Sequence, residues 1–313
     1  MSTVLVTGGA GFVGSHLCER LLAEGKRVIA VDDLSTGRVA NIAEARAYGA
    51  QFTFYSVDVC AEGMSTILGR HRPDLVYHLA ARPEARSVLD PRQDAHASVA
   101  GLLNLLEAAA AAGVGKVVLA SCASVYGQAR KFPVRETMLA GARPKTPGAI
   151  GKRLAEEYLR FYERFRGVDF TVLVLATVYG PRRDPAGDPG LVGSAAVRML
   201  AGERPIVRGD GHQTRDFVFV DDVVHALALA ADRGSGRVLN VGGGVETSVN
   251  ALCHMLGEII GFRGEPLPGP PEAGDVRRMV LDIEQAGLEI GWRPWTHLED
   301  GLAETVASIR EQL

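Results

Sequence analysis

A glycine-rich turn close to the N-terminus limits what this chain can fold into. The apolar run Val4 to Thr7 leads directly into Gly8-Gly9-Ala10-Gly11-Phe12-Val13-Gly14, and an amphipathic segment follows. These glycines match the G-x-G-x-x-G spacing, in which glycine permits a tight turn, lets backbone N–H groups approach a pyrophosphate and lets the next helix pack on the strand. The pattern predicts a strand, a turn and a helix, with a bound phosphate at the helix N-terminus.

A second apolar run indicates which dinucleotide the turn binds. Arg27 to Val31 has the pattern of a strand, and Asp32 follows it, 18 positions after Gly14. A carboxylate at this place accepts hydrogen bonds from the adenine ribose hydroxyls and repels the 2′-phosphate of NADP. We therefore expect NAD as the cofactor, held by Gly8, Gly11, Phe12, Val13, Gly14, Asp32 and Asp33.

Strand-like and helical segments alternate along the chain. The strand-like runs cover residues 4–7, 27–31, 51–57, 75–79, 116–121, 170–176 and 238–241, and the longest helical candidates cover residues 96–112 and 151–165. This alternation predicts the α/β class, as a Rossmann-type doubly wound parallel sheet with helices on both faces.

Prolines and glycines become frequent after Gly180 and again between Pro266 and Pro271, and these segments are expected to leave the sheet. We predict an NAD-binding Rossmann domain from residues 1–179, to which residues 216–244 return. A smaller C-terminal substrate-binding lobe is expected from residues 180–215 and 245–313. A ligand in such a fold lies beyond the carboxyl ends of the strands, between the sheet and the lobe.

Composition argues against several classes of protein. The formal net charge of −3 gives no basic footprint, so nucleic acid is not expected as a partner. We find no apolar run near the roughly 20 residues that span a bilayer and no charged segment before the first apolar run, so we expect a cytoplasmic protein without a membrane partner. The four cysteines are scattered and form no CxxC pair, which predicts reduced thiols and no metal site.

Several motifs occur in the order typical of one enzyme family. They are Thr7 to Gly14, Asp58-Val59, His78-Leu79-Ala80-Ala81, Val125-Tyr126-Gly127, Val178-Tyr179-Gly180-Pro181, Arg215-Asp216-Phe217 with Val220-Asp221-Asp222-Val223, and Gly274-Asp275-Val276 near Gly291-Trp292. Together they resemble the extended short-chain dehydrogenase/reductase family, specifically its nucleotide-sugar 4-epimerases and dehydratases of the UDP-glucose/galactose type. The resemblance covers nearly the whole chain.

The resemblance implies a redox-neutral reaction on bound NAD, in which a sugar hydroxyl is oxidised by hydride transfer and the hydride later returns. In the family, a tyrosine four residues before a lysine takes the hydroxyl proton, and a serine or threonine stands three positions before Val-Tyr-Gly. The lysine holds the nicotinamide ribose, and its charge lowers the tyrosine pKa. Here Lys152 matches the lysine, but Gly148 occupies the tyrosine position and Cys122 the serine or threonine position.

Glycine carries no group that can take a proton, so the proton acceptor stays open. Lys152, Cys122, a water in the space left at Gly148 or the substrate itself could serve, and Glu84 is the carboxylate considered as an alternative base. Cys122 could act as a thiolate beside Lys152 or pack as a small buried hydrophobe. The Tyr126 hydroxyl is another group expected near the site, although we expect this ring to pack.

Further cofactor and substrate contacts are expected in the same stretches. The cofactor set adds Asp58, Val59, Leu79, Ala80, Ala81 and Lys152, and the substrate set is Arg82, Glu84, Thr177, Arg215 and Arg277. Thr177 replaces the family's asparagine, and Glu272 stands where the family has an arginine that grips the substrate diphosphate. Arg143, Arg182 or Arg183 could substitute for it, because guanidinium groups suit phosphate.

We therefore expect an NAD-dependent nucleotide-sugar epimerase that acts at C4 through a transient keto-sugar. A dehydratase or a net oxidoreductase of the same family is the alternative, although Ala123 and Ser124 stand where dehydratases carry an acidic residue. A binding protein that keeps NAD and a sugar nucleotide without turnover is the second class. The resemblance also implies a homodimer through the two long helices. His78 is expected to be a packed core residue and His212 a surface residue.

Overall fold

The computed structural model describes residues 2–184, 187–270 and 276–313. Its main feature is a seven-stranded sheet with the order β10-β6-β5-β4-β1-β2-β3, in which every neighbouring pair is parallel. The strands are β1 (Thr3–Thr7), β2 (Arg27–Asp32), β3 (Phe52–Ser56), β4 (Leu75–His78), β5 (Lys116–Cys122), β6 (Asp169–Leu175) and β10 (Arg237–Val241). The predicted doubly wound α/β fold is confirmed.

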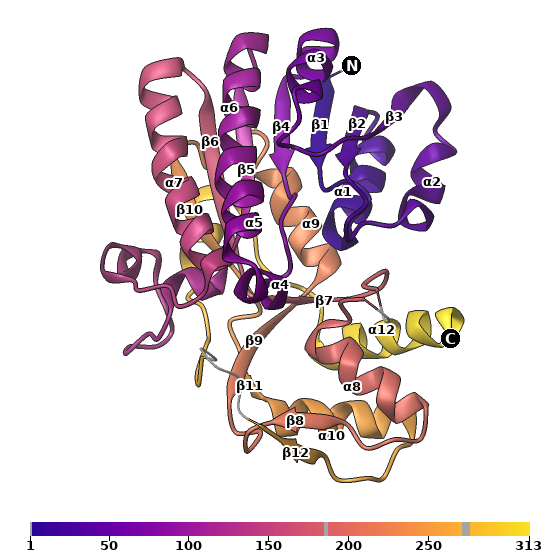
Figure 1. Ribbon diagram of the computed structural model, residues 1–313. Helices are drawn as coiled ribbons and strands as arrows, with labels where there is room; N and C mark the ends of the chain where they lie inside the picture. Colours follow the sequence, from indigo (N-terminus) through magenta and orange to yellow (C-terminus); the bar gives the residue numbers. More distant parts are fainter. Residues whose placement is uncertain (1, 185–186, 271–275) are drawn as a thin grey trace.

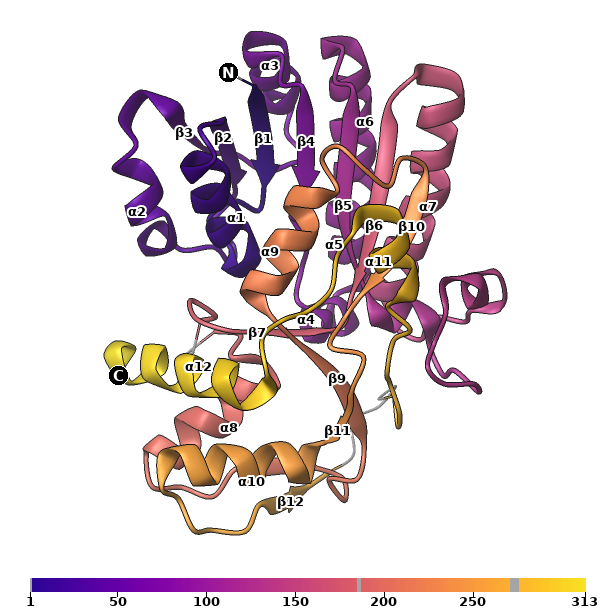
Figure 2. The ribbon, with the colours of Figure 1, turned by 180° about the vertical axis from the view of Figure 1, so that it is seen from behind.

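Helices cover both faces of this sheet (Figures 1 and 2). One face carries α3 (Gly63–His71), α6 (Gly101–Ala112) and α7 (Pro147–Arg166), and the other carries α1 (Phe12–Ala23) and α9 (Val220–Leu229). Successive residues of β1 belong to different cores, because Val4 and Val6 pack on one side and Leu5 packs on the other. Burial on both faces explains why the strands are continuous apolar runs.

A smaller group of elements lies beyond the carboxyl ends of the large sheet (Figure 1). It contains a three-stranded sheet in the order β11-β9-β7 and a two-stranded sheet of β8 and β12. The strands are β7 (Thr177–Tyr179), β8 (Ile206–Arg208), β9 (Thr214–Phe219), β11 (Glu246–Ser248) and β12 (Leu267–Gly269). The helices are α8 (Gly190–Leu200), α10 (Val249–Ile260) and α12 (Leu298–Gln312).

Residues 216–244 divide between the two parts. Strand β10 joins the large sheet, whereas β9 pairs with β7 and β11 in the three-stranded sheet. Helix α11 (Glu284–Ile290), from the C-terminal part of the chain, contacts β10. The chain therefore crosses between the two parts more often than the sequence pattern indicates, and the proposed domain boundaries stay a prediction.

Short elements connect these parts. They are η1 (Val39–Ile42), α2 (Ala43–Arg46), η2 (Gly49–Gln51), α4 (Glu84–Leu89), α5 (Pro91–Ala95), the π-helical turn η3 (His96–Ala100), η4 (Ala123–Tyr126) and η5 (Glu136–Gly141). The predicted helix over residues 96–112 begins earlier, because α5, η3 and α6 run on continuously from Pro91.

By length and hydropathy, the segment Pro91–Ala112 could cross a bilayer, with 33% of its most apolar window buried. The sequence analysis expects no apolar run of this length, so this segment departs from that expectation. In the structure, α6 packs against α3 and η3 packs against α7. The apolar side chains of Pro91–Ala112 therefore contribute to the helix layer on one face of the sheet.

Candidate active site

The glycine-rich turn is too compact for side chains at its key positions. A Cβ at Gly14 would lie 2.0 Å from the carbonyl oxygen of Gly8, and a Cβ at Gly8 would lie 2.8 Å from the backbone nitrogen of Ala80. Gly11 is the N-cap residue of α1; no side chain caps it, and the first turn carries no acidic residue. The N–H groups of Gly8 to Gly11 are hydrogen-bonded within the protein, so it is the uncapped N–H groups at the start of α1 that can bind an anion such as a pyrophosphate.

Asp32 ends β2 beside this turn and is 6% exposed. Its carboxylate accepts hydrogen bonds from the backbone N–H groups of Ala10 at 3.0 Å and Leu34 at 2.9 Å. Burial raises the pKa of Asp32, and these two hydrogen bonds act in the opposite direction. Asp33 is exposed, and its carboxylate accepts from the backbone and hydroxyl of Ser35. Asp32 thus couples the adenosine side of the expected NAD site to the glycine turn.

The other expected cofactor residues lie at neighbouring strand ends. Leu79 and Ala80 directly follow β4 and approach Gly8 closely, and the Ala80 N–H donates to Thr7 Oγ1 at 3.3 Å. Asp58 and Val59 follow β3; the Asp58 carboxylate accepts from the Cys60 N–H at 2.8 Å. Ala81 is an exposed residue of the segment after β4. The chain thus brings these strand ends to the edge where the glycine turn lies.

Lys152 extends from α7 to the carboxyl end of β5. Its Nζ donates a hydrogen bond to the carbonyl oxygen of Ala120 at 2.9 Å. Burial lowers the pKa of Lys152, while the nearby Cys122 and Asp94 act to raise it. A cation held here can donate to a ribose hydroxyl and favour a developing negative charge on a sugar oxygen.

Gly148 lies in the first turn of α7, which begins earlier than the predicted residue 151. Thr146 is the N-cap residue, with Oγ1 accepting from the Ala149 N–H at 3.4 Å, and Pro147 occupies the first helical position. A threonine followed by proline is a helix-start signal that the sequence analysis missed. The Gly148 N–H donates to the Ser87 hydroxyl at 3.2 Å, which ties α7 to α4.

Cys122 is the last residue of β5, and its Sγ lies 2.9 Å from the Ser124 hydroxyl. Burial raises the pKa of the Cys122 thiol, and the Ser124 hydroxyl acts to lower it. The thiol form is therefore favoured, which argues against the thiolate, one of the alternatives left open for Cys122. In this form Cys122 can donate a hydrogen bond, as the serine or threonine at this position would.

Tyr126 packs in the core, as expected, and its hydroxyl has a protein partner. Its side chain is 3% exposed, and its hydroxyl donates to Asn240 Oδ1 of β10 at 2.7 Å. Burial raises the pKa of this phenol, with the carboxylate of Glu136 acting in the same direction. The ring belongs to the core, and the hydroxyl holds η4 against β10.

Arg82 and Glu84 lie in the segment that joins β4 to α7 through α4. The Arg82 Nε is buried and has no hydrogen-bond partner among the described residues. The Glu84 carboxylate accepts from the Thr146 hydroxyl at 2.6 Å. Arg82 therefore presents a donor without an acceptor next to the site, whereas Glu84 is engaged with the start of α7.

The remaining expected substrate residues lie in the smaller part of the molecule. Thr177 begins β7, and Arg215 of β9 donates to the carbonyl oxygens of Thr214 and Val276. Arg277 makes a two-pronged ion pair with Asp210, with distances of 2.6 and 2.9 Å. Glu272, at the position of the family's diphosphate-binding arginine, lies outside the described residues.

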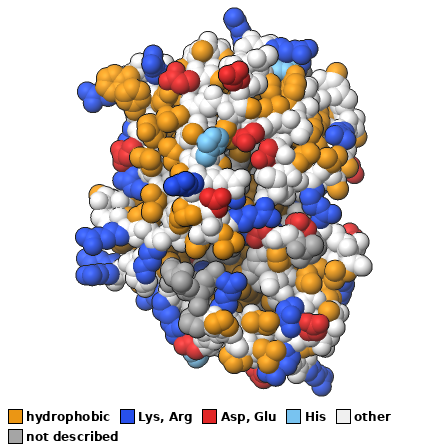
Figure 3. Space-filling view, viewed as in Figure 1, with side chains coloured by type: hydrophobic (Ala, Val, Ile, Leu, Met, Phe, Trp, Pro, Cys, Tyr) orange, Lys and Arg blue, Asp and Glu red, His pale blue; other side chains and the backbone are white. Residues whose placement is uncertain are grey.

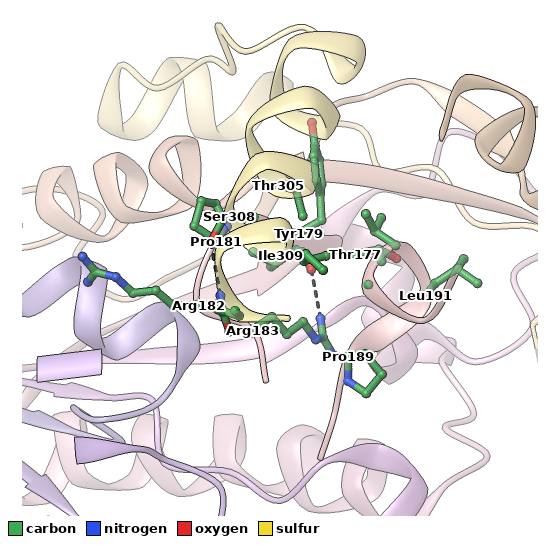
Figure 4. A pocket seen from close by; sticks show the side chains of 15 residues that line it. Thr177, Tyr179, Pro181, Arg182, Arg183, Pro189, Leu191, Thr305, Ser308 and Ile309 are labelled. Carbon is green, nitrogen blue, oxygen red and sulfur yellow. Dashed lines mark hydrogen bonds between the residues drawn. The ribbon is translucent and has the colours of Figure 1, made fainter. Parts of the chain in front are cut away.

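Two of the arginines considered as substitutes for the diphosphate anchor have protein partners. Arg182 donates to both carboxylate oxygens of Glu19 at 2.8 Å, and Arg183 donates to Val178 and Asp188. Both lie in the loop after β7 and line a pocket between β7, α8 and α12 (Figure 4). The pocket also includes Thr177 of the expected substrate set, but not Arg82, Glu84, Arg215 or Arg277. Arg143 is exposed.

The histidines behave as expected. His78 is 2% exposed and its Nδ1 lies 2.7 Å from the Thr7 hydroxyl, and burial lowers its pKa to about 3. His212 is an exposed loop residue. The described residues hold no group of three or more histidine, cysteine or acidic side chains that could bind a metal ion.

One buried carboxylate escaped the sequence analysis. Asp94 of α5 is 2% exposed and lies close to Gly148 and Gly151 of α7. It interacts electrostatically with Arg82 and Lys152. The local sequence gave little signal, because Asp94 follows the polar Arg92 and Gln93 and stands two residues before the expected start of the helix.

Together these groups form a site at the carboxyl ends of β1, β4 and β5. The start of α1 offers N–H groups to an anion, Lys152 offers a cation, Cys122 and Ser124 offer hydrogen-bond donors, and Asp94 offers a buried carboxylate. Such a set can hold a dinucleotide beside an alcohol and move the alcohol proton.

Known proteins resemble this chain in sequence and fold. Residues 4–242 match the model of the NAD dependent epimerase/dehydratase family. A UDP-glucose 4-epimerase of Mycolicibacterium smegmatis is 42% identical over 98% of this chain and 98% of that protein. The crystal structure of a UDP-glucose 4-epimerase from Thermotoga maritima with UDP-glucose is 43% identical, with a TM-score of 0.94 and 99% of each chain covered. That of the Thermus thermophilus UDP-glucose 4-epimerase with NAD is 36% identical, with a TM-score of 0.92 and coverage of 99% and 100%.

Proposed function

The chain belongs to the NAD dependent epimerase/dehydratase family, and on that premise we propose that it is a nucleotide-sugar 4-epimerase that interconverts UDP-glucose and UDP-galactose. The observation that carries the proposal is the placement of Lys152. Its Nζ is held at the carboxyl end of β5, where the family's cofactor lysine is expected. The relatives that are named UDP-glucose 4-epimerases support the choice of sugar nucleotide.

NAD is the cofactor. The residues that would hold it fit a dinucleotide, because the turn excludes side chains at Gly8 and Gly14 and α1 begins without a side-chain cap or an acidic residue. Asp32 would accept from the adenine ribose, and Lys152 would donate to the nicotinamide ribose. When bound, NAD supplies a hydride acceptor that gives the hydride back to the other face of the sugar.

The protein's own residues act on the sugar nucleotide. The buried Arg82 Nε offers a donor to a phosphate or sugar oxygen, and Arg215 lies on β9 beyond the sheet edge. The Cys122 thiol and Ser124 hydroxyl offer hydrogen bonds to the sugar at the end of β5. These contacts must leave the sugar free to turn, because the hydride leaves one face of C4 and returns to the other.

Dehydration is the second candidate within the family. It requires an acid that eliminates water across the ring, and the two positions after Cys122 are Ala123 and Ser124. Neither side chain carries a carboxyl group that could supply this proton. The Ser124 hydroxyl instead lies 2.9 Å from the Cys122 sulfur. Epimerisation needs no such acid.

We also propose that the protein is a homodimer that uses the outer face of α7. Ile150, Leu154, Phe161 and Phe165 are 41–62% exposed and follow one side of the helix. Hydrophobic side chains gather over α6 and α7 in the space-filling view (Figure 3). Such a stripe is typical of a surface that is covered by a second subunit.

A cytoplasmic location is proposed as well. All four cysteines are free, and they lie in four different parts of the chain. Free thiols are typical of proteins in reducing compartments.

The proposed activity is tested with the purified protein, NAD and a panel of nucleotide sugars, followed by proton NMR. UDP-galactose and UDP-glucose should interconvert, and the 4-epimer should be the only product. A dehydratase would release a 4-keto-6-deoxy sugar, and a protein that binds without turnover would leave every sugar unchanged. Either result would overturn the proposal.

A further inference from the structure

Two glycines on α7 allow neighbouring helices to approach closely. A Cβ at Gly151 would lie 2.4 Å from Ser98 Oγ, and a Cβ at Gly148 would lie 3.2 Å from Ser87 Oγ. Gly148 and Gly151 are three residues apart and thus share one face of the helix. Glycine is a poor helix former, and the close approach of α4 and η3 explains its presence at both positions.

The carboxylate of Asp94 faces this glycine pair. A Cβ at Gly148 would lie 3.7 Å from Asp94 Oδ1, and a Cβ at Gly151 would lie 3.9 Å from Asp94 Oδ2. Asp94 is 2% exposed, and its Oδ2 accepts from the Ser98 hydroxyl at 3.4 Å. In the described part of the chain, Oδ1 accepts no hydrogen bond from a side chain. One oxygen is thus free to accept a proton beside the position where the family's tyrosine is missing.

The surroundings of Asp94 suit a proton acceptor. The charged groups that act on it are Arg82, from the segment before α4, and Lys152 of α7. Burial raises the pKa of the Asp94 carboxyl, while the Ser98 hydroxyl and these two cations lower it. A raised pKa makes this carboxylate a stronger base than an exposed aspartate.

The other candidate groups fit this role less well. Glu84 is exposed and its carboxylate is bonded to the Thr146 hydroxyl. The Cys122 thiol is bonded to Ser124, and burial favours its neutral form. The Lys152 Nζ donates to the carbonyl oxygen of Ala120, as a protonated ammonium group does, so it is not placed to accept a proton. Asp94 is the buried carboxylate in reach of the glycine pair.

We propose that Asp94 is the proton acceptor of the reaction and replaces the tyrosine that is absent at Gly148. The O–H bond of the sugar 4-hydroxyl breaks and its proton passes to Asp94 Oδ1. The electron pair of that bond forms the second C–O bond, and the hydrogen on C4 leaves with its electron pair to the oxidised nicotinamide dinucleotide. The reverse transfers regenerate the alcohol and the Asp94 carboxylate. This inference rests on the proposed epimerase function.

The test compares the holoenzyme with Asp94→Asn and with the matched control Asp90→Asn. Asp90 is the exposed N-cap residue of α5, the helix that carries Asp94. Its carboxylate accepts a hydrogen bond from the Gln93 N–H at 3.0 Å. On UDP-galactose, Asp94→Asn should lower kcat by about 100-fold or more, the loss typical of a missing general base. NAD affinity, measured by calorimetry, should stay within about threefold of wild type, because the variant removes an interaction made in the reaction. Asp90→Asn should keep its turnover.

The two variants separate the role of Asp94 from the proposed function. If Asp94→Asn turns over like Asp90→Asn, the role of Asp94 is wrong and the epimerase function stands. If the wild-type protein converts no nucleotide sugar, the proposed function fails and the role of Asp94 fails with it.

A titration of the wild-type protein keeps the proposal testable if Asp94→Asn does not fold. Carbon-13 NMR of protein labelled at aspartate carboxyls follows Asp94 directly, with Asp94→Glu used for assignment. The Asp94 pKa should lie above the ordinary aspartate value of about 3.9. A pKa at or below that value would overturn the proposal, because such a carboxylate is a poor base near neutral pH.

Discussion

The Nζ of Lys152 donates a hydrogen bond to the carbonyl oxygen of Ala120 at 2.9 Å, which fixes the ammonium at the end of β5. Lys152→Met keeps the length of the side chain and removes the charge. NAD should bind about 10- to 100-fold more weakly, because a hydrogen bond from a charged group contributes about 1.5–3 kcal/mol. Calorimetric titration with NAD measures this loss.

The control for this variant is Lys145→Met, which removes an exposed lysine just before α7 whose Nζ donates to Gln128. It should leave NAD affinity unchanged. Equal affinities of Lys152→Met and wild type would show that Lys152 does not contact the cofactor.

Asp32 should determine the preference for NAD. The wild-type protein should bind NAD more tightly than NADP, because the Asp32 carboxylate repels the 2′-phosphate. Asp32→Asn removes the negative charge that repels this phosphate. The ratio of the affinity for NAD to the affinity for NADP should therefore fall by about tenfold or more. The neighbouring variant Asp33→Asn, at an exposed carboxylate bonded to Ser35, should change the ratio less. If Asp32→Asn left this affinity ratio unchanged, the adenine ribose would not contact Asp32.

Stability should fall in acid because His78 is buried without charge. Its pKa is about 3 in the folded state, against about 6.5 for an unfolded chain. Between these values the unfolded state binds a proton that the folded state does not, so the free energy of unfolding falls by up to about 1.4 kcal/mol for each pH unit below 6.5. Urea unfolding at several pH values measures this slope.

His16 acts in the same direction, since burial lowers its pKa to about 4. His78→Asn should therefore flatten the acid slope without abolishing it. A slope between pH 6.5 and 4 as steep in the variant as in the wild type would mean that His78 takes up its proton in the folded state.

The exposed face of α7 should be a subunit interface. Phe161→Glu places a charge in the stripe that contains Leu154 and Phe165, and burial of an unpaired charge is costly. The variant should sediment as a monomer at concentrations where the wild type is a dimer. Leu288→Glu is the control, because Leu288 is 72% exposed on α11. A monomeric wild type would contradict the proposed dimer.

The sequence predicted the large sheet well because its strands are buried on both faces and therefore form continuous apolar runs. The glycine turn was equally clear, since its spacing is set by local contacts such as that of Gly14 with Gly8. The start of α7 was placed four residues too late, although Thr146 and Pro147 signal it.

Long-range contacts were beyond the sequence pattern. The Tyr126 hydroxyl donates a hydrogen bond to Asn240, 114 residues away, a contact that no local pattern indicates. Asp94 was missed for the same reason, because only the packing of α5 on α7 brings it to Gly148 and Gly151. A parallel sheet brings residues from distant segments of the chain to one edge. The local hydrophobic pattern does not indicate which of these residues come into contact.

The path of the hydrogen on C4 tests the proposed function most directly. The protein is incubated with NAD and UDP-galactose that carries deuterium at C4 of the sugar, in ordinary water, and the product is examined by NMR. Hydride transfer and return within one site predicts UDP-glucose with the deuterium retained at C4. UDP-glucose with ordinary hydrogen at C4, or no conversion at all, would contradict a 4-epimerase that works through a transient keto-sugar.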